Sequence, residues 1–193
     1  TAYALCELIK TALADQHIHD KVLIHTDTDL LVSGKAKDRL QNNRIGCGNS
    51  FFKFSNVRWK WTGKAKADPR LQRFIQEMLD GDVSKLRSGR VCGAFMPWPV
   101  FQLFGVIFRY YFKDDYFKRK PERHWPVTEI AIPSILHFLE GQDATFSPPL
   151  IEVPKDKKVP RQAIDRLLKK GEQFGLKKIG RDTDSEVFHQ LMH

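Results

Sequence analysis

Hydrophobic and polar positions change their spacing several times along this chain. Apolar residues between Ala4 and Leu13 recur three and four residues apart, which predicts an amphipathic helix. Val22, Leu23 and Ile24 follow without alternation, a pattern typical of a strand buried on both faces of a parallel sheet. Helices and strands that alternate in this way predict an α/β domain with a mostly parallel or mixed sheet flanked by helices.

The later pattern predicts further elements. Residues Ser50–Trp61 approximate the two-residue alternation of a strand, and Asp68-Pro69 is a typical helix start. The remaining predicted elements are a short strand at Val91–Met96, an aromatic helix at Val100–Phe117, a helix after Thr128 that contains Pro133, and a final helix from about Arg161 to Lys170.

The length of 193 residues suits one domain with a substantial core. We expect residues 1–150 to form the α/β core, and residues 151–193 to form a basic C-terminal segment whose helix packs on it. Because the chain opens directly in a helical pattern, we also expect it to be the later part of a longer protein, with an α/β domain incomplete at its N-terminus.

The net charge bears on the kind of partner, and the cysteine content bears on the cellular compartment. The net charge of +9 favours acidic partners: sugar nucleotides, anionic lipid surfaces or nucleic acid. The three cysteines lack the paired spacing of a zinc site or a disulfide framework, which indicates a reducing compartment. The sequence contains no apolar run of transmembrane length. We therefore expect a cytoplasmic protein, with association with a membrane surface as an added expectation.

The candidate chemistry lies directly after the first predicted strand, in the D-x-D motif Asp27-Thr28-Asp29. Side chains alternate along a strand, so both carboxylates point the same way at its carboxyl end, where α/β sheets bind ligands. Two such carboxylates suit Mg²⁺ or Mn²⁺, which can in turn hold a phosphate. The alternative is ordinary turn or helix-cap chemistry, for which Asp and Thr are equally common.

The order of these pieces resembles a GT-A type glycosyltransferase. The resemblance is carried by the D-x-D motif after a helix and strand, by the glycine-containing segment Gly89–Phe95, by Glu129 at the start of a helix, and by a late histidine, His189. It covers roughly residues 4–189. The nucleotide-binding first half of that family is absent before the first helix.

The resemblance implies transfer of a sugar from a nucleotide-sugar donor to a hydroxyl of a glycan or lipid-linked acceptor. It implies that Asp27, Asp29 and His189 hold Mn²⁺ or Mg²⁺. Glu129 would be the catalytic base of an inverting reaction, or would orient the acceptor in a retaining one. The implied substrate contacts are Arg90, for phosphate oxygens, together with Gly93, Ala94 and Trp125.

Three alternatives stand beside this hypothesis. Thr128 could be a helix N-cap, with Glu129 placed in the first turn by the helix dipole. The run Arg58-Trp59-Lys60-Trp61 could mark a basic nucleic-acid-binding module, because exposed aromatics stack on bases while cations hold phosphates. The aromatic helix Val100–Phe117 could instead dock a partner protein or a membrane surface.

Overall fold

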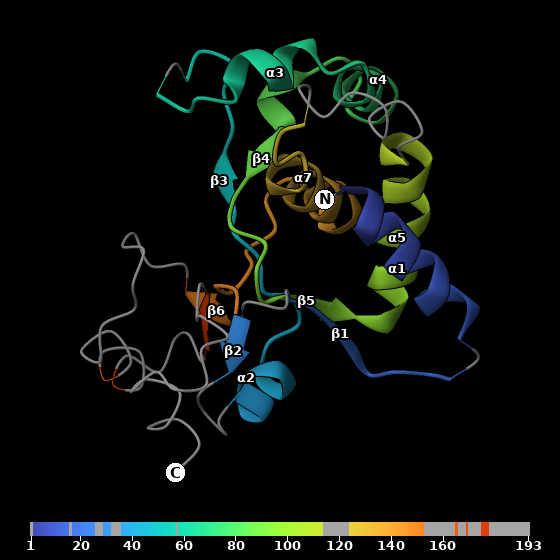
Figure 1. Ribbon diagram of the computed structural model, residues 1–193, viewed down its shortest axis with the longest axis vertical. Helices are drawn as coiled ribbons and strands as arrows, with labels where there is room; N and C mark the ends of the chain where they lie inside the picture. Colours follow the sequence, from blue (N-terminus) through green and yellow to red (C-terminus); the bar gives the residue numbers. More distant parts are fainter. Residues whose placement is uncertain are drawn as a thin grey trace. The chain divides into compact units, whose positions relative to one another are not determined.

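The secondary structure of the first of two structural units is mainly helical, and that described for the second is mainly short strands with the helix α2 (Ala36–Asn42) (Figure 1). The computed structural model describes residues 2–15, 17–25, 29–31, 36–56, 58–113, 124–152, 165, 169 and 175–177, without the side chains of 29–31, 152 and 176–177. Unit 1 comprises residues 1–20, 49–89 and 97–145, and unit 2 comprises residues 21–48, 90–96 and 146–193. The predicted mixture of helices and strands is confirmed.

The aromatic helix α5 (Trp98–Phe112) is the centre of unit 1. Phe101, Phe104, Phe108 and Phe112 form a buried row, with ring centroids 6.2, 5.4 and 5.3 Å apart. The helices that pack on α5 are α1 (Ala2–Ala14), α4 (Pro69–Met78) and α7 (Thr128–Glu140). The aromatic residues of this helix therefore build the core of the unit, while Leu103, Val106 and Tyr110 stay exposed.

Helix α1 confirms the first predicted helix, but its inward face is only partly the predicted one. Ile9, predicted on the apolar face, is buried together with Cys6, whereas Leu8, predicted on the same face, is 66% exposed. The inward face follows the contact with α5, where a Cβ built on Gly105 would lie only 2.7 Å from Ile9 Cγ2. A side chain at position 105 would push the two helices apart, so glycine permits their close approach.

The predicted strand Ser50–Trp61 is wrong over most of its length. Among the residues of this range that the structure describes, only β3 (Ser50–Phe51) is a strand, paired antiparallel with β4 (Arg87–Ser88), and turns lead from it to α3 (Thr62–Ala67). The aromatic residues pack edge to face instead of alternating, because Trp59 contacts both Phe52 and Trp125, with centroids 5.5 and 6.0 Å apart.

The described part of unit 2 contains short strands and a short helix. Strand β1 (Lys21–Ile24) pairs with β5 (Ala94–Pro97), and β7 (Gly175–Lys177) lies between β2 (Asp29–Leu31) and β6 (Ile151–Glu152). The β2–β7 pair is antiparallel and the β6–β7 pair is parallel, so this sheet is mixed. Helix α2 (Ala36–Asn42) contributes Ala36 to a small core that also contains Phe95 and Leu150.

The first strand differs from the expectation of a fully buried parallel strand. All four residues of β1 are half-buried. Its direction relative to β5 is antiparallel, because Gly93 N bonds Ile24 O at one end and Trp98 N bonds Asp20 O at the other. A run of three apolar residues is too short to distinguish a two-sided strand from one covered on a single face.

The predictions for the C-terminal part of the chain concern residues that the structure describes only in small part. The helix predicted at 161–170 is represented only by Asp165 and Lys169, both helical, and most of the predicted segment 151–193 lies outside the described residues. The domain boundary at residue 150 stays a prediction. Within the described part of the chain, no helix combines the length and apolar character needed to cross a bilayer.

Candidate functional site

The D-x-D motif follows β1 in the sequence, and its last residue, Asp29, is the first residue of β2. Asp27 and His189 are outside the described residues, and Asp29 is described only by its backbone. Asp29 opens β2 and is the register partner of Lys177 in β7. The predicted set of two carboxylates and one imidazole therefore stays a prediction.

Gly93, predicted in the substrate-binding segment, lies at the carboxyl end of β1. Its amide donates to the Ile24 carbonyl across 2.7 Å, and its own carbonyl accepts the amide of Leu150 at 2.9 Å. Its φ is +75°, and a Cβ at this position would lie 2.4 Å from the backbone nitrogen of Ile151. Both the backbone conformation and the close approach of Ile151 require glycine here.

The neighbours of Gly93 are placed differently in unit 2. Ala94 is the first residue of β5 and is fully buried. Arg90 is exposed, and its carbonyl accepts the amide of Gly48 at 3.2 Å. Of the two side chains, that of Arg90 is exposed and that of Ala94 is not.

Glu129, the predicted catalytic base, lies half-buried in the first turn of α7 in unit 1. The N-cap of this helix is Val127, without a side-chain cap, so the expectation that Thr128 is the N-cap is wrong. Pro133 is inside the helix and has no N–H to donate to the Glu129 carbonyl four residues earlier. That carbonyl instead accepts the amide of Gly89 at 2.9 Å.

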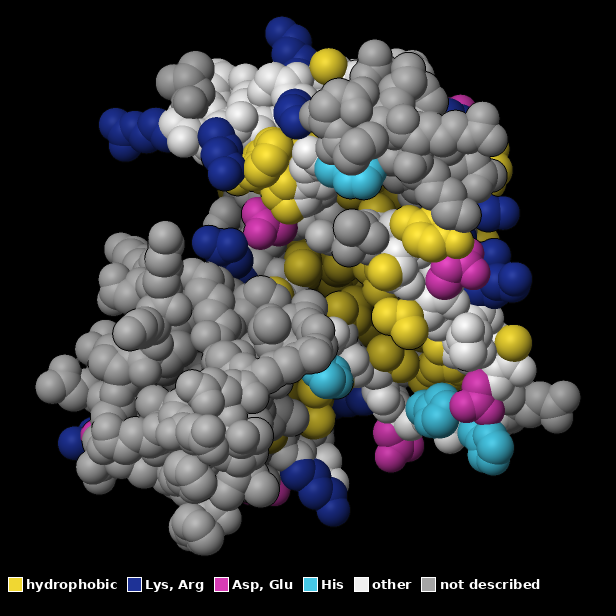
Figure 2. All heavy atoms as spheres, viewed as in Figure 1, with side chains coloured by type: hydrophobic (Ala, Val, Ile, Leu, Met, Phe, Trp, Pro, Cys, Tyr) yellow, Lys and Arg dark blue, Asp and Glu magenta, His cyan; other side chains and the backbone are white. Residues whose placement is uncertain are grey.

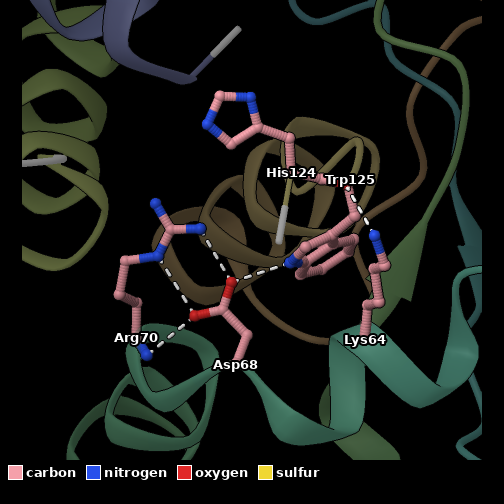
Figure 3. A network of polar contacts seen from close by, with 5 residues as sticks. All are labelled: Lys64, Asp68, Arg70, His124 and Trp125. Carbon is pink, nitrogen blue, oxygen red and sulfur yellow. Dashed lines mark hydrogen bonds and ion pairs between the residues drawn. The ribbon is translucent and has the colours of Figure 1, made fainter. Parts of the chain in front are cut away.

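Trp125, predicted to contact substrate, belongs to a buried polar network (Figure 3). Its indole Nε1 donates to Asp68 Oδ2 at 2.8 Å. Asp68 is 2% exposed and is the N-cap of α4, since its Oδ1 accepts the Arg70 amide at 2.9 Å. The Arg70 guanidinium adds two bonds to the same carboxylate, at 3.1 and 2.7 Å. These contacts hold the indole of Trp125 against the start of α4.

Lys64 completes the contacts drawn in Figure 3, donating to the carbonyl of His124 at 3.4 Å. The sequence identified Asp68 as part of a helix start, but its bond to Trp125 joins positions 57 residues apart. No local spacing predicts such a pair.

A second cluster that the sequence analysis missed lies where α4 packs on α5. The Arg73 guanidinium carbon lies 4.6 Å from the centroid of the Tyr110 ring, and Arg73 Nε donates to Glu77 Oε1 at 2.8 Å. The hydroxyl of Tyr111 donates to Glu77 Oε2 at 2.9 Å. The four-residue spacing of Arg73 and Glu77 on a predicted helix was the available signal.

Two pKa shifts follow from this cluster. Hydrogen bonds from Arg73 and then Tyr111 lower the pKa of Glu77 below its usual value. Burial, and then the hydrogen bond to Glu77, raise the pKa of Tyr111 to about 12. At neutral pH the cluster therefore pairs the charged Arg73 guanidinium and Glu77 carboxylate with a neutral Tyr111 hydroxyl that donates to the carboxylate.

The predicted site residues divide between the two units. Among the described ones, Trp125 and Glu129 belong to unit 1, and Asp29, Arg90, Gly93 and Ala94 belong to unit 2. Among the described residues no group of three His, Cys, Asp or Glu side chains is arranged to hold a metal ion. The donor set expected for the metal, two carboxylates and an imidazole, is chemically suited to Mn²⁺ but lies in the undescribed part.

Comparisons with protein families, with curated proteins and with solved structures gave no match to this chain.

Proposed function

We propose that this chain is a GT-A-like, metal-dependent glycosyltransferase domain, or the catalytic half of one, that uses a nucleotide-sugar donor. The observation that carries the proposal is the bond from Gly93 N to Ile24 O. Within unit 2 it pairs the glycine-containing segment with the end of the strand that leads into the D-x-D motif. These are two of the elements on which the resemblance rests, and they are separated by about 70 residues of sequence.

The metal and the donor phosphates would be bound at the D-x-D motif. Asp27 and Asp29 would be the carboxylate ligands, and His189 would add a nitrogen. When bound, a divalent cation neutralises the charge of the donor diphosphate and so makes it a better leaving group. The exposed Arg90 would donate hydrogen bonds to phosphate oxygens from the same unit.

By the resemblance, Glu129 would be the base that takes the proton of the acceptor hydroxyl in an inverting reaction, or would orient the acceptor in a retaining one. Glu129 is half-buried in the first turn of α7, in unit 1, and a carboxylate is a group that can accept a proton from a hydroxyl.

A basic nucleic-acid-binding module is less well supported. Single-stranded nucleic acid needs successive aromatic side chains on which bases stack. Trp59 packs edge to face against Phe52 and Trp125, so the interleaved run offers Trp61 but not two free platforms. For this reason we retain the transferase as the function that the geometry supports best.

The proposal is tested by incubating the protein with a panel of nucleotide sugars, with Mn²⁺, Mg²⁺ or EDTA. We expect release of nucleoside diphosphate from one donor class, dependent on the divalent cation and lost in Asp27→Asn and in Asp29→Asn. Lys37→Gln, an exposed change on α2 in the same unit, is the control and should keep full activity. Equal turnover in EDTA, or full activity in both aspartate variants, would overturn the proposal.

A further inference from the structure

Positive charge is concentrated in one stretch of unit 1. Residues 49–67 contain the cations Lys53, Arg58, Lys60, Lys64 and Lys66 and no Asp or Glu, so this stretch carries five of the chain's nine net positive charges. All five cationic side chains are exposed. Figure 2 shows Lys and Arg side chains gathered at the top of the view, over the part of the chain that Figure 1 labels α3.

Trp61 lies among these cations. Its side chain is half-buried, and the ammonium groups of Lys60 and Lys64 lie 4.8 and 5.1 Å from its ring centroid. Attraction between each cation and the ring offsets part of the repulsion between the two ammonium groups. We call these six residues, Lys53, Arg58, Lys60, Trp61, Lys64 and Lys66, the Trp61 patch.

A segment with five exposed cations, no acidic residue of its own and one half-buried indole is complementary to an anionic partner. Trp is favoured at the headgroup level of a bilayer, where its ring is partly apolar and its N–H stays hydrated. Lysine and arginine beside it are attracted to anionic headgroups, while their aliphatic stems can reach along the interface. A partner that requires several stacked aromatics fits less well, because Trp59 is engaged in the aromatic packing of the unit.

We propose that the Trp61 patch docks the protein on an anionic lipid surface, with the Trp61 ring at headgroup depth and the cations on lipid phosphates and carboxylates. The sequence suggested the aromatic helix as the element that docks on a membrane surface. The phenylalanine row of that helix is buried in the core of unit 1, so the proposed docking surface is a different one. The proposal does not depend on the glycosyltransferase function, and either can fail without the other.

The test is co-sedimentation of the whole chain with phosphatidylcholine vesicles, with and without about a third of phosphatidylserine. We expect binding only to the anionic vesicles, and binding that weakens as salt shortens the range of electrostatic attraction. Because each cation near such a surface contributes roughly a factor of five in binding, Lys60→Gln/Lys64→Gln should bind about 25-fold more weakly. Trp61→Phe should lose the blue shift of tryptophan fluorescence that accompanies vesicle binding.

The matched control is Lys10→Gln/Lys37→Gln, which removes two exposed lysines outside the patch. It lowers the net charge by the same amount and should bind nearly as well as the original chain. Absence of binding to anionic vesicles, or equal losses in the two double variants, would overturn the proposal. So would tight binding of a single-stranded oligonucleotide that depends on Lys60 and Lys64 while vesicles are not bound. Donor turnover without vesicles should be unchanged in Lys60→Gln/Lys64→Gln, which separates this test from that of the transferase.

Discussion

The amide of Gly89 donates a hydrogen bond to the carbonyl of Glu129 across 2.9 Å. In a regular helix that carbonyl would accept the amide of residue 133, but residue 133 is proline and has no N–H. The proline therefore leaves a carbonyl on α7 that the residue after β4 satisfies. The missing helix hydrogen bond thus allows the loop after β4 to bind the first turn of α7 at Glu129, the proposed base.

This explanation predicts the effect of Pro133→Ala. The new amide at position 133 competes for the Glu129 carbonyl, so the Gly89 amide should exchange its hydrogen roughly two- to tenfold faster. Hydrogen exchange measured by NMR checks this. The Gly93 amide, bonded to Ile24 in the other unit, is the internal control. Unchanged protection at Gly89 would show that the proline has no part in this attachment.

Gly93→Ala should destabilise the protein strongly. The alanine would adopt φ near +75° and place its Cβ 2.4 Å from Ile151 N, so strain and overpacking both oppose it. Gly141→Ala is the matched control, because Gly141 has a φ of +101° but no heavy atom within 4 Å of a built Cβ. We expect Gly141→Ala to lower the free energy of unfolding by about 1–3 kcal/mol.

Urea denaturation should show a further loss of about 1–3 kcal/mol for Gly93→Ala beyond that of Gly141→Ala. Equal losses for the two variants would mean that unit 2 relaxes around the new methyl group. The close packing of Ile151 on Gly93 would then not be a constraint on the sequence.

Trp125→Phe should lower the free energy of unfolding by about 1–3 kcal/mol, because it removes a donor from the buried carboxylate of Asp68. Trp59→Phe is the comparison. It changes a half-buried indole that contacts Trp125 but does not donate to Asp68, and should cost less. Thermal or chemical denaturation checks both. A Trp125→Phe variant as stable as the original chain would contradict a stabilising role for this bond.

The raised pKa of Tyr111 predicts a pH dependence of stability at the alkaline end. Burial and the bond to Glu77 raise the pKa to about 12 in the folded chain, above the value of about 10 expected after unfolding. The folded state therefore holds its proton more tightly, so this contribution is complete below pH of about 10 and disappears between about 10 and 12.

Tyr111→Phe should accordingly show a smaller fall in stability over that alkaline range than the original chain does. Urea denaturation at a series of pH values measures the difference between the two, which cancels the titration of the other tyrosines and lysines. Parallel curves for the two proteins would contradict the shift.

Local patterns predicted several elements correctly. The helix start at Asp68-Pro69 was readable because an N-cap and a first-turn proline act within a few residues, and Asp68 does cap α4. The phenylalanine row of α5 was readable because its helical spacing is independent of its partners. The inward face of α1 was not, since Leu8 and Ile9 are equally apolar and the packing on Gly105 selects Ile9.

For the candidate site too, the sequence predicts the local motifs but not the contacts between distant segments. The acidic motif and the glycine segment could be found as short patterns, but the bond from Gly93 to Ile24 could not, because it depends on which strands pair. Similarly, the aromatic residues between Phe52 and Trp61 have the approximate two-residue spacing of a strand. Its true arrangement depends on Trp125, which supplies the second ring against which Trp59 packs.

The central claim is that Asp27 and Asp29 bind a divalent cation, and anomalous diffraction from crystals soaked in Mn²⁺ tests it most directly. We predict an anomalous peak within coordination distance of both carboxylates, with His189 as an additional ligand, and loss of that peak in Asp29→Asn. Crystals without a peak at this position, in which the two carboxylates point apart or cap backbone amides, would contradict the claim and leave the motif as turn chemistry.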